Sequence, residues 1–108
     1  MIIKPIIKKF GRFVQIIVKI RDEKRKYINA DLSLIITSPN KKEYIFLPAS
    51  SQPEISSLYP EQFTKFINNI GEGKYQVFFQ PEENGLHNLK IFARFENEIE
   101  EKSYFMLF

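Results

Sequence analysis

Hydrophobic residues recur at every second position over much of this chain. Residues 13–21 read FVQIIVKIR, in which one set of alternate positions is entirely aliphatic and the other includes glutamine, lysine and arginine. Successive side chains of a strand point to opposite faces, so this alternation predicts a strand with one buried face. The same pattern indicates further strands at 31–37, 43–47, 74–80, 86–95 and 102–108.

Turn-forming residues separate these segments at intervals of about eight to twelve residues. They include a charged turn at 22–26, the Ser38-Pro39-Asn40 stop, the PEENG turn at 81–85 and an acidic turn at 96–101. About seven short strands at this spacing are typical of an antiparallel immunoglobulin-like β-sandwich, and an all-β barrel also fits. We expect residues 1–108 to form a single domain, because the chain is short and contains no linker.

One segment supports two interpretations. The apolar residues of 59–70 fall at the spacing of an amphipathic helix face, and Gly71 suits the position just after such a helix. The stretch 63–68 is also an acceptable strand, with Gly71 and Gly73 in a hairpin loop before the next strand. We expect a strand and keep the short helix as the alternative.

Composition and charge exclude several classes of protein. The chain has no cysteine, so disulfides, thiolate nucleophiles and sulfur-ligated metal sites are absent. Lys4 and Pro5 interrupt the amino-terminal apolar run, and no run approaches the roughly 20 residues that span a bilayer. Residues 1–54 carry a formal charge of +6 and residues 55–108 carry −3. The basic residues form short clusters beside expected turns, without a nucleic-acid-binding motif, so we expect no nucleic-acid partner and no membrane span.

The stretch 71–93, GEGKYQVFFQPEENGLHNLKIFA, combines strand-forming and turn-forming residues in a recurring pattern. Gly73 and Gly85 suit turns with positive φ, Pro81 ends a strand, and alternating aliphatic residues follow. This pattern resembles filamin repeats, macroglobulin-type domains and bacterial immunoglobulin-like modules. The resemblance implies an immunoglobulin-like fold and a non-catalytic module of a larger protein, serving as a spacer, adhesion or partner-binding domain in an extracellular or cell-surface setting.

Groups that commonly carry catalysis or bind metals are scarce. His87 is the only histidine, and its phase with Leu89 and Ile91 turns it toward the core, so we expect a structural, hydrogen-bonded histidine. The glutamates of segment 96–101 lack the spacing of a calcium loop and indicate a solvated hairpin. We therefore expect no catalytic residue, no cofactor and no metal, and a chain that is not an enzyme.

Some apolar residues lie on the outward phase of their own strands. These residues are Ile17, Ile35, Phe78 and Phe92. In the usual immunoglobulin strand order, Ile35 and Phe92 share the outer face of one sheet, where a wet surface would carry polar side chains. We predict that this face packs on a neighbouring domain or a protein partner, and scattered surface residues of no consequence are the alternative.

An exposed sheet edge offers a second route to a partner. We expect the edge at 43–47, where Glu43, Tyr44 and Ile45 would pair with an extended peptide by strand addition. The charges of Lys41, Lys42 and Glu43 are equally suited to protecting that edge from unwanted pairing.

Two functions from different classes follow. The first is a structural or protein-interaction module. The second is a carbohydrate-binding module attached to a glycan-active enzyme, whose stacking faces would be Tyr27, Tyr44, Tyr59, Phe78 and Phe92. The absence of tryptophan, the largest aromatic platform, favours the first.

Overall fold

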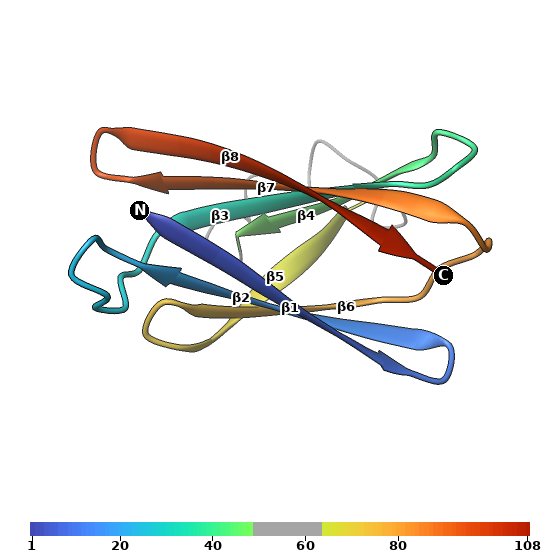
Figure 1. Ribbon diagram of the computed structural model, residues 1–108, viewed down its shortest axis with the longest axis horizontal. Helices are drawn as coiled ribbons and strands as arrows, with labels where there is room; N and C mark the ends of the chain where they lie inside the picture. The colour runs from blue at the N-terminus through green and yellow to red at the C-terminus, as the bar shows by residue number, and fades with distance from the viewer. Residues whose placement is uncertain (49–63) are drawn as a thin grey trace.

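The computed structural model describes residues 1–48 and 64–108, which form eight strands and no helix (Figure 1). In chain order the strands are β1 (Ile2–Phe10), β2 (Phe13–Arg21), β3 (Asp31–Thr37), β4 (Glu43–Pro48), β5 (Thr64–Gly71), β6 (Lys74–Phe79), β7 (Leu86–Phe95) and β8 (Glu98–Leu107). The expected all-β class is therefore confirmed for the described part of the chain. Strand β1, which has a weaker alternation, was missing from the sequence-based expectation.

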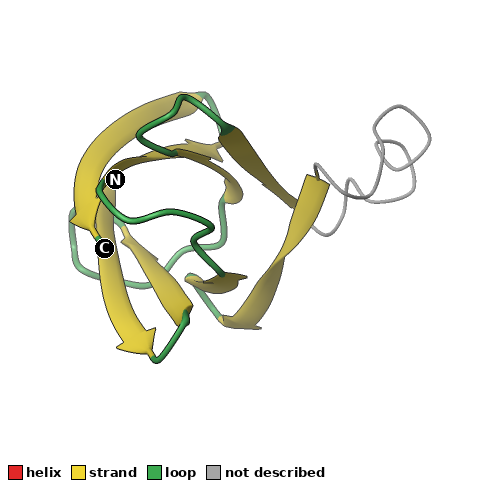
Figure 2. Ribbon diagram, turned by 90° about the vertical axis from the view of Figure 1, so that its right-hand side faces the viewer, coloured by secondary structure: helices red, strands yellow, loops and turns green. Residues whose placement is uncertain are grey.

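The eight strands belong to one hydrogen-bonded sheet in the order β1-β2-β6-β5-β4-β3-β7-β8. All neighbouring strands are antiparallel except β4 and β5, where residues 45–48 pair in parallel with residues 64–67. The sheet curls until it is nearly closed, as the view along the strands shows (Figure 2). An antiparallel sandwich of seven strands was therefore the wrong expectation, because β4 and β5 join the two halves into one mixed sheet of eight.

Alternation along each strand decides which side chains enter the core. The half formed by β1, β2, β6 and β5 faces the half formed by β4, β3, β7 and β8, and buried apolar side chains fill the space between them. The largest fully buried side chains come from both halves: Phe46, Phe79, Ile16, Ile20, Leu32, Leu34, Ile36, Leu89, Ile91, His87 and Val18. The period-two pattern thus identified the inner face correctly.

Strands β1 and β8 are the two ends of the sheet, and side chains tie them together across a seam. The Tyr104 hydroxyl donates to the carbonyl oxygen of Ile3 at 3.3 Å. The Lys9 ammonium donates to the carbonyl oxygen of Leu107 at 2.7 Å. The sheet therefore closes through side-chain contacts at this seam, and its two edges keep backbone groups outside the ladder.

The segment with two interpretations forms a strand where it is described. Residues 45–48 of β4 flank β5 on one side, and β6 flanks it on the other, so its backbone groups are used in sheet ladders. Ile67 enters the core, which explains the apolar residue at that position. The strand expected at 63–68 is confirmed from Thr64 onward, and residues 59–63 lie outside the described part of the chain.

Tyr75 fixes the start of β3 to β6 through its hydroxyl group. The hydroxyl accepts a hydrogen bond from the Ala30 N–H at 2.7 Å and donates one to the Ala30 carbonyl oxygen at 2.9 Å. The side chain is buried, and this burial raises its pKa above the ordinary value of 10.0, while the hydrogen bonds to Ala30 act in the opposite direction. A neutral Tyr75 is therefore the form that the fold favours.

We expect Tyr75→Phe to lower the free energy of unfolding by about 1–3 kcal/mol near neutral pH, because the Ala30 N–H loses its acceptor. The contribution of Tyr75 is fully present below its unfolded pKa of 10.0 and is lost as pH rises through the higher folded pKa. The stability difference between wild type and variant should consequently shrink above about pH 10. Urea unfolding of both proteins at a series of pH values measures this difference. A stability difference that grows above about pH 10 would contradict the role given to the neutral Tyr75 hydroxyl.

Candidate functional site

The outer face of β3, β4 and β7 carries residues that were predicted to meet a partner. Leu34 and Ile36 are buried on the inner face, so Ile35 between them points outward, where it is half-buried. The register places Ile35 opposite Ile45 of β4 on one side and Lys90 of β7 on the other. Ile35 and Ile45 therefore form an apolar cross-strand pair on the outside of the sheet.

Phe92 lies on the same outer face, in the row next to that of Ile35. Its inner-face neighbours Ile91 and Ala93 are buried, whereas Phe92 itself is half-buried. Beside it is a hollow of about 440 Å³, which Leu47 and Ile99 also line. The structure thus brings Ile35, Ile45 and Phe92 onto one outer surface next to a shallow hollow.

The edge expected at 43–47 is paired on both sides from Ile45 onward. Strand β4 lies inside the sheet, and at Ile45 it pairs with β3 on one side and β5 on the other, so an added strand has no room. Tyr44 turns inward and places its ring edge-to-face against Phe79, with 4.9 Å between ring centroids, and burial raises its pKa. Glu43 is exposed. The prediction of strand addition was therefore wrong at Ile45, and for Glu43 and Tyr44 it stays a prediction.

The true edges, β1 and β8, carry residues that oppose strand addition. Pro5 in β1 lacks an N–H and is a residue that sheets tolerate at their edges. Exposed charged residues accompany it, including Lys8 in β1 and Glu101 and Lys102 in β8. Such charges and prolines protect edges from unwanted pairing, so we expect neither edge to accept a peptide strand.

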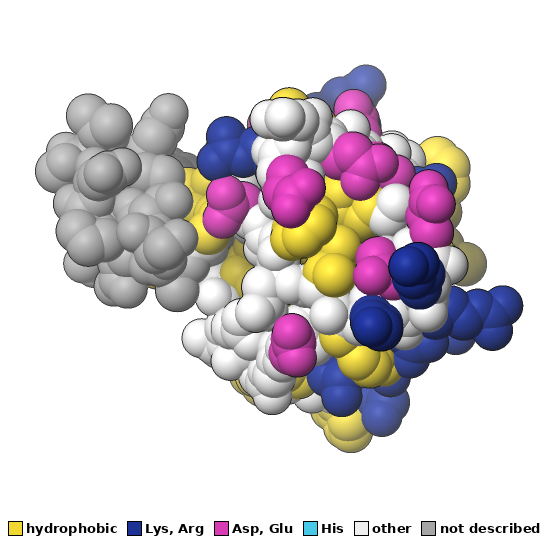
Figure 3. All heavy atoms as spheres, turned by 90° about the vertical axis from the view of Figure 1, so that its left-hand side faces the viewer, with side chains coloured by type: hydrophobic (Ala, Val, Ile, Leu, Met, Phe, Trp, Pro, Cys, Tyr) yellow, Lys and Arg dark blue, Asp and Glu magenta, His cyan; other side chains and the backbone are white. Residues whose placement is uncertain are grey.

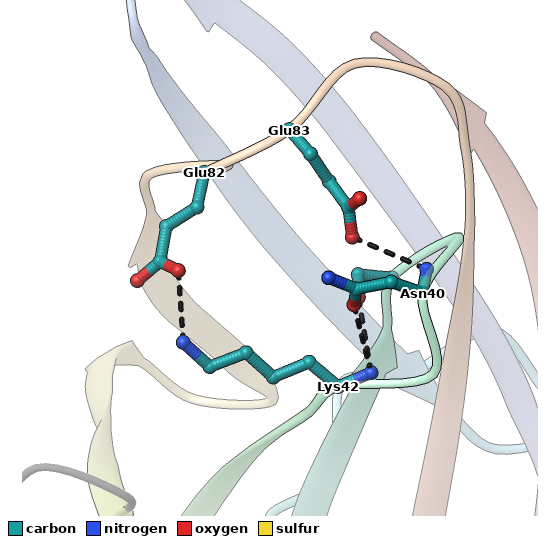
Figure 4. Close-up of polar contacts among 5 residues, drawn as sticks. Asn40, Lys42, Glu82 and Glu83 are labelled. Atoms are coloured by element: carbon teal, nitrogen blue, oxygen red, sulfur yellow. Dashed lines mark hydrogen bonds and ion pairs between the residues drawn. The ribbon is translucent and has the colours of Figure 1, made fainter.

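Two turns at one end of the molecule are joined by polar contacts (Figure 4). The Lys42 ammonium and the Glu82 carboxylate form an ion pair at 2.8 Å, which raises the pKa of Lys42. The Asn40 N–H donates to the Glu83 carboxylate at 3.3 Å. Both members of the ion pair are well exposed, so water screens their attraction. This cluster fixes the turns after β3 and β6 and offers no group prepared for chemistry.

His87 lies in the core, as its phase predicted. Its side chain is fully buried, and its Nδ1 atom lies 3.0 Å from the carbonyl oxygen of Gly85. The rings of Phe79 and Phe108 flank the imidazole with centroids 6.0 and 5.0 Å away. The Nε2 atom has no hydrogen-bond partner among the described residues. The surroundings are aromatic and closed to solvent, which agrees with the structural role expected for this histidine.

The acidic residues of 96–101 do not converge on one point. Glu100 lies 3.4 Å from the amino-terminal ammonium of Met1, whereas Glu101 lies 3.8 Å from the ammonium of Lys90. Glu96 occupies the turn between β7 and β8 with φ of 55°. In residues 1–48 and 64–108, no three histidine or carboxylate side chains are grouped to hold a metal ion. Glu100 and Glu101 thus form separate ion pairs, and acidic side chains are spread over this end of the molecule (Figure 3).

A row of lysines on the opposite outer face was missed by sequence reasoning. The register places Lys4 of β1, Lys19 of β2 and Lys74 of β6 directly opposite one another. Their positions alternate with the buried residues Ile3, Val18 and Tyr75, so all three lysines point outward. The available signal was the absence of Asp and Glu from these three strand segments. Recognising the row also requires knowing which strands pair.

Comparisons with protein-family models, with curated protein sequences and with solved structures find no match to this chain. The described residues contain no helix that is long and apolar enough to cross a membrane.

Proposed function

We propose that this chain is a non-catalytic, immunoglobulin-like module that binds a partner protein. The strand order supports the immunoglobulin-like assignment. One half of the sheet runs β1-β2-β6-β5 and the other runs β4-β3-β7-β8. Lettered in chain order, with β4 as the additional C′ strand, these halves correspond to the ABED and CFG sheets of an immunoglobulin constant-type domain. The proposed binding surface is the outer face of β3, β4 and β7.

The observation that carries the binding surface is the apolar cluster around Phe92. Ile35, Ile45 and Phe92 point away from the core, and the adjacent hollow has Leu47 and Ile99 in its wall. A contiguous apolar patch on an outer sheet face marks a site where a protein partner packs. The occupant that fits is a partner segment with an apolar side chain to pack on Phe92. It would also carry polar groups for Asp31 and Arg94, which line the same hollow.

An ion pair at the rim of the hollow would help to orient the partner. Arg94 and Asp31 lie beside the hollow and contact each other at 2.9 Å, with most of both side chains exposed. Such a rim pair contributes little to affinity and more to the choice of partner orientation. The apolar residues would therefore supply the binding free energy, as anchors at the centre of an interface commonly do.

We expect the double substitution Ile35→Ser and Phe92→Ser to weaken partner binding at least tenfold, corresponding to about 1.4 kcal/mol. The immobilised wild-type domain would first be used to identify bound proteins by mass spectrometry. A purified partner would then be titrated calorimetrically against wild type and variant. The matched control is Ile17→Ser, which removes a half-buried outward isoleucine from β2 in the other half of the sheet.

Circular dichroism melting separates a binding defect from unfolding. The double variant should keep a cooperative transition, since both side chains lie outside the core. Loss of folding, or equal binding by the purified partner to wild type and double variant, would reject the proposed surface. If no purified protein binds the wild-type domain, the interaction function itself is rejected.

The rings predicted to stack on carbohydrate do not share one platform in the described residues. Tyr27 and Phe78 lie on the outer side of the β2 and β6 half, Phe92 lies on the opposite half, and Tyr44 packs inward on Phe79. Tyr59 falls outside the described residues. Sugar-binding sites use aromatic rings arranged on one surface, so this predicted set of rings does not favour carbohydrate binding over the first function.

A further inference from the structure

The two halves of the sheet differ sharply in charge. Strands β1, β2, β5 and β6 contain no aspartate or glutamate, whereas β3, β4, β7 and β8 contain five acidic and three basic residues. A surface of one sign concentrates ligands of the opposite sign. The basic residues of the acid-free half are Lys4, Lys8, Lys9, Lys19, Arg21, Lys65 and Lys74.

The register concentrates this charge on the outer surface. Lys4, Lys19 and Lys74 lie directly opposite one another on adjacent strands, an arrangement in which like charges repel. No ion pair within residues 1–48 and 64–108 involves any of the three. The row therefore presents three outward ammonium groups without a carboxylate, and a bound anion would relieve their repulsion.

A fourth cation extends the row. Arg21 follows Lys19 on the outward phase of β2, and its guanidinium lies 4.4 Å from the centroid of the Tyr27 ring. The ammonium of Lys74 approaches the same ring at 4.7 Å. Arg21 also donates a hydrogen bond to the Tyr27 hydroxyl. Tyr27 thus holds Arg21 and Lys74 in place, so the cationic surface is positioned before a ligand arrives.

Three exposed phenylalanine rings occupy the other end of the same outer face. Phe10 and Phe13 lie opposite each other at the β1–β2 hairpin, and Phe78 lies opposite Gln15 on β6. These rings are 58%, 53% and 50% exposed. Directly opposed and diagonal residues of neighbouring strands lie about 5–8 Å apart, so each ring is within reach of the next.

Amide groups connect the rings with the cations. The Gln15 amide donates to the Gln76 side-chain oxygen at 2.8 Å, between the phenylalanine rings and the lysine row. Lys4 and Phe10 are six residues apart on β1, a distance of about 20 Å along the strand. The face therefore forms a track of cations, amides and aromatic rings, in which Lys8 adds a further cation beside the rings.

We propose that the outer face of β1, β2 and β6 binds single-stranded nucleic acid, a partner that was not expected from the basic clusters in the sequence. Phosphates would contact Lys4, Lys19, Arg21 and Lys74, and unpaired bases would stack on Phe10, Phe13 and Phe78. Cations that follow the backbone, with aromatic rings for successive bases, are the combination by which sheet surfaces bind single strands. Duplex DNA fits less well, because its bases already stack on one another and cannot lie on the rings.

The test uses the full chain and a fluorescein-labelled oligothymidylate of about 12 nucleotides, within the site size of a small single-strand-binding domain. Fluorescence anisotropy would give the affinity at a series of salt concentrations. We expect Lys19→Glu with Lys74→Glu to reduce affinity at least about tenfold and to flatten the plot of log K against log salt by roughly 1.4, the loss of two phosphate contacts. The charge-matched control is Lys90→Glu with Lys102→Glu on β7 and β8, and it should leave the affinity nearly unchanged.

A second pair of variants tests the aromatic end. Phe13→Ser with Phe78→Ser should reduce affinity at least about fivefold while leaving the salt dependence in place, because stacking on uncharged rings releases no counterions. Phe105→Ser on β8 removes an equally exposed ring, 69% exposed, from the other half and serves as the control. Circular dichroism melting verifies that every variant is folded.

Several results would overturn the proposal. The first is absence of oligonucleotide binding at about 50 mM salt, where electrostatic contacts are strong. An equal loss of affinity in the lysine control variant would show that only overall charge matters. Unchanged affinity after substitution of Phe13 and Phe78 would show that the rings do not stack on bases. Binding to vesicles containing phosphatidylserine in preference to the oligonucleotide would assign the face to lipid instead.

Discussion

Replacing Gly73 with alanine is expected to lower the free energy of unfolding by about 2–5 kcal/mol, the combined effect of a left-handed alanine and an overfilled site. Gly73 has φ of +67° in the turn before β6. A Cβ atom there would lie 2.7 Å from the carbonyl oxygen of Ile20 and 2.9 Å from the backbone N and O atoms of Ile28. All three neighbours are backbone atoms, which cannot rotate away.

Hydrogen bonds hold these neighbours in place. The Ile20 N–H donates to the Gly73 carbonyl oxygen at 2.8 Å, and the Ile28 N–H donates to the Ile20 carbonyl oxygen at 3.1 Å. The Gly73 N–H donates to the Asn29 side-chain oxygen at 3.0 Å. Accommodating a methyl group would stretch this network, so we expect the strain to be felt in β2 and in the segment that precedes β3.

Gly11→Ala is the matched control. Gly11 has φ of +60°, and a Cβ atom there would have no neighbour within 4 Å. Only the left-handed backbone then opposes alanine, and the expected cost is about 1–2 kcal/mol. Urea unfolding followed by circular dichroism compares the two variants. An equal decrease in the free energy of unfolding for Gly11→Ala and Gly73→Ala would mean that the crowded backbone around Gly73 relaxes freely.

Phe79→Ala is expected to lower the free energy of unfolding by about 3–5 kcal/mol. The Phe79 side chain of β6 is only 1% exposed and contacts aromatic groups from several parts of the fold. Its ring centroid lies 4.9 Å from that of Tyr44, 6.0 Å from that of His87 and 6.4 Å from that of Phe108. Truncation would leave a cavity where both halves of the sheet meet.

The adjacent residue supplies the control for this substitution. Phe78 points to the outer face and is 50% exposed, so Phe78→Ala should change stability by no more than about 0.5–1 kcal/mol. Both variants lose the same side chain from neighbouring positions of one strand. Chemical unfolding of the two variants therefore tests which side chains of β6 point inward and which point outward. Similar losses of unfolding free energy at both positions would contradict the assigned directions.

Sequence reasoning identified most strands, because hydrophobic alternation is visible over a few residues. It placed β2 and β3 within their observed bounds and anticipated positive φ at Gly73 and Gly85. It also oriented Ile35, Phe92 and His87 correctly, since the phase of a strand is set by its own buried residues. These are local properties of the chain.

The main error of the sequence-based prediction was the position of the sheet edges, although one residue indicated a true edge strand. Pro5 interrupts the apolar run of β1 and is compatible with an edge strand, yet this segment was not expected to be a strand at all. Charged residues around 41–43 suggested an edge at β4, but charged turn residues occur beside interior strands as well. Composition near a strand therefore does not reveal how many neighbours that strand has.

The lysine row shows why part of the site could not be predicted from the sequence. Lys4, Lys19 and Lys74 are separated by 15 and 55 positions in the chain, and each alone resembles an ordinary surface lysine. They become a single feature only through the pairing of β1 with β2 and of β2 with β6. The uneven charge along the sequence indicated polarity without showing the face on which it gathers.

By itself, the sequence determined the β class and the inward or outward direction of side chains along most strands, because both depend on neighbours two residues apart. Only the tertiary structure decided the parallel pairing of β4 with β5, the two edges at the seam and the meeting of three lysines on one face. The physical reason is that strand order depends on how the whole sheet curls around a shared core, and that balance involves contacts between residues far apart in the chain.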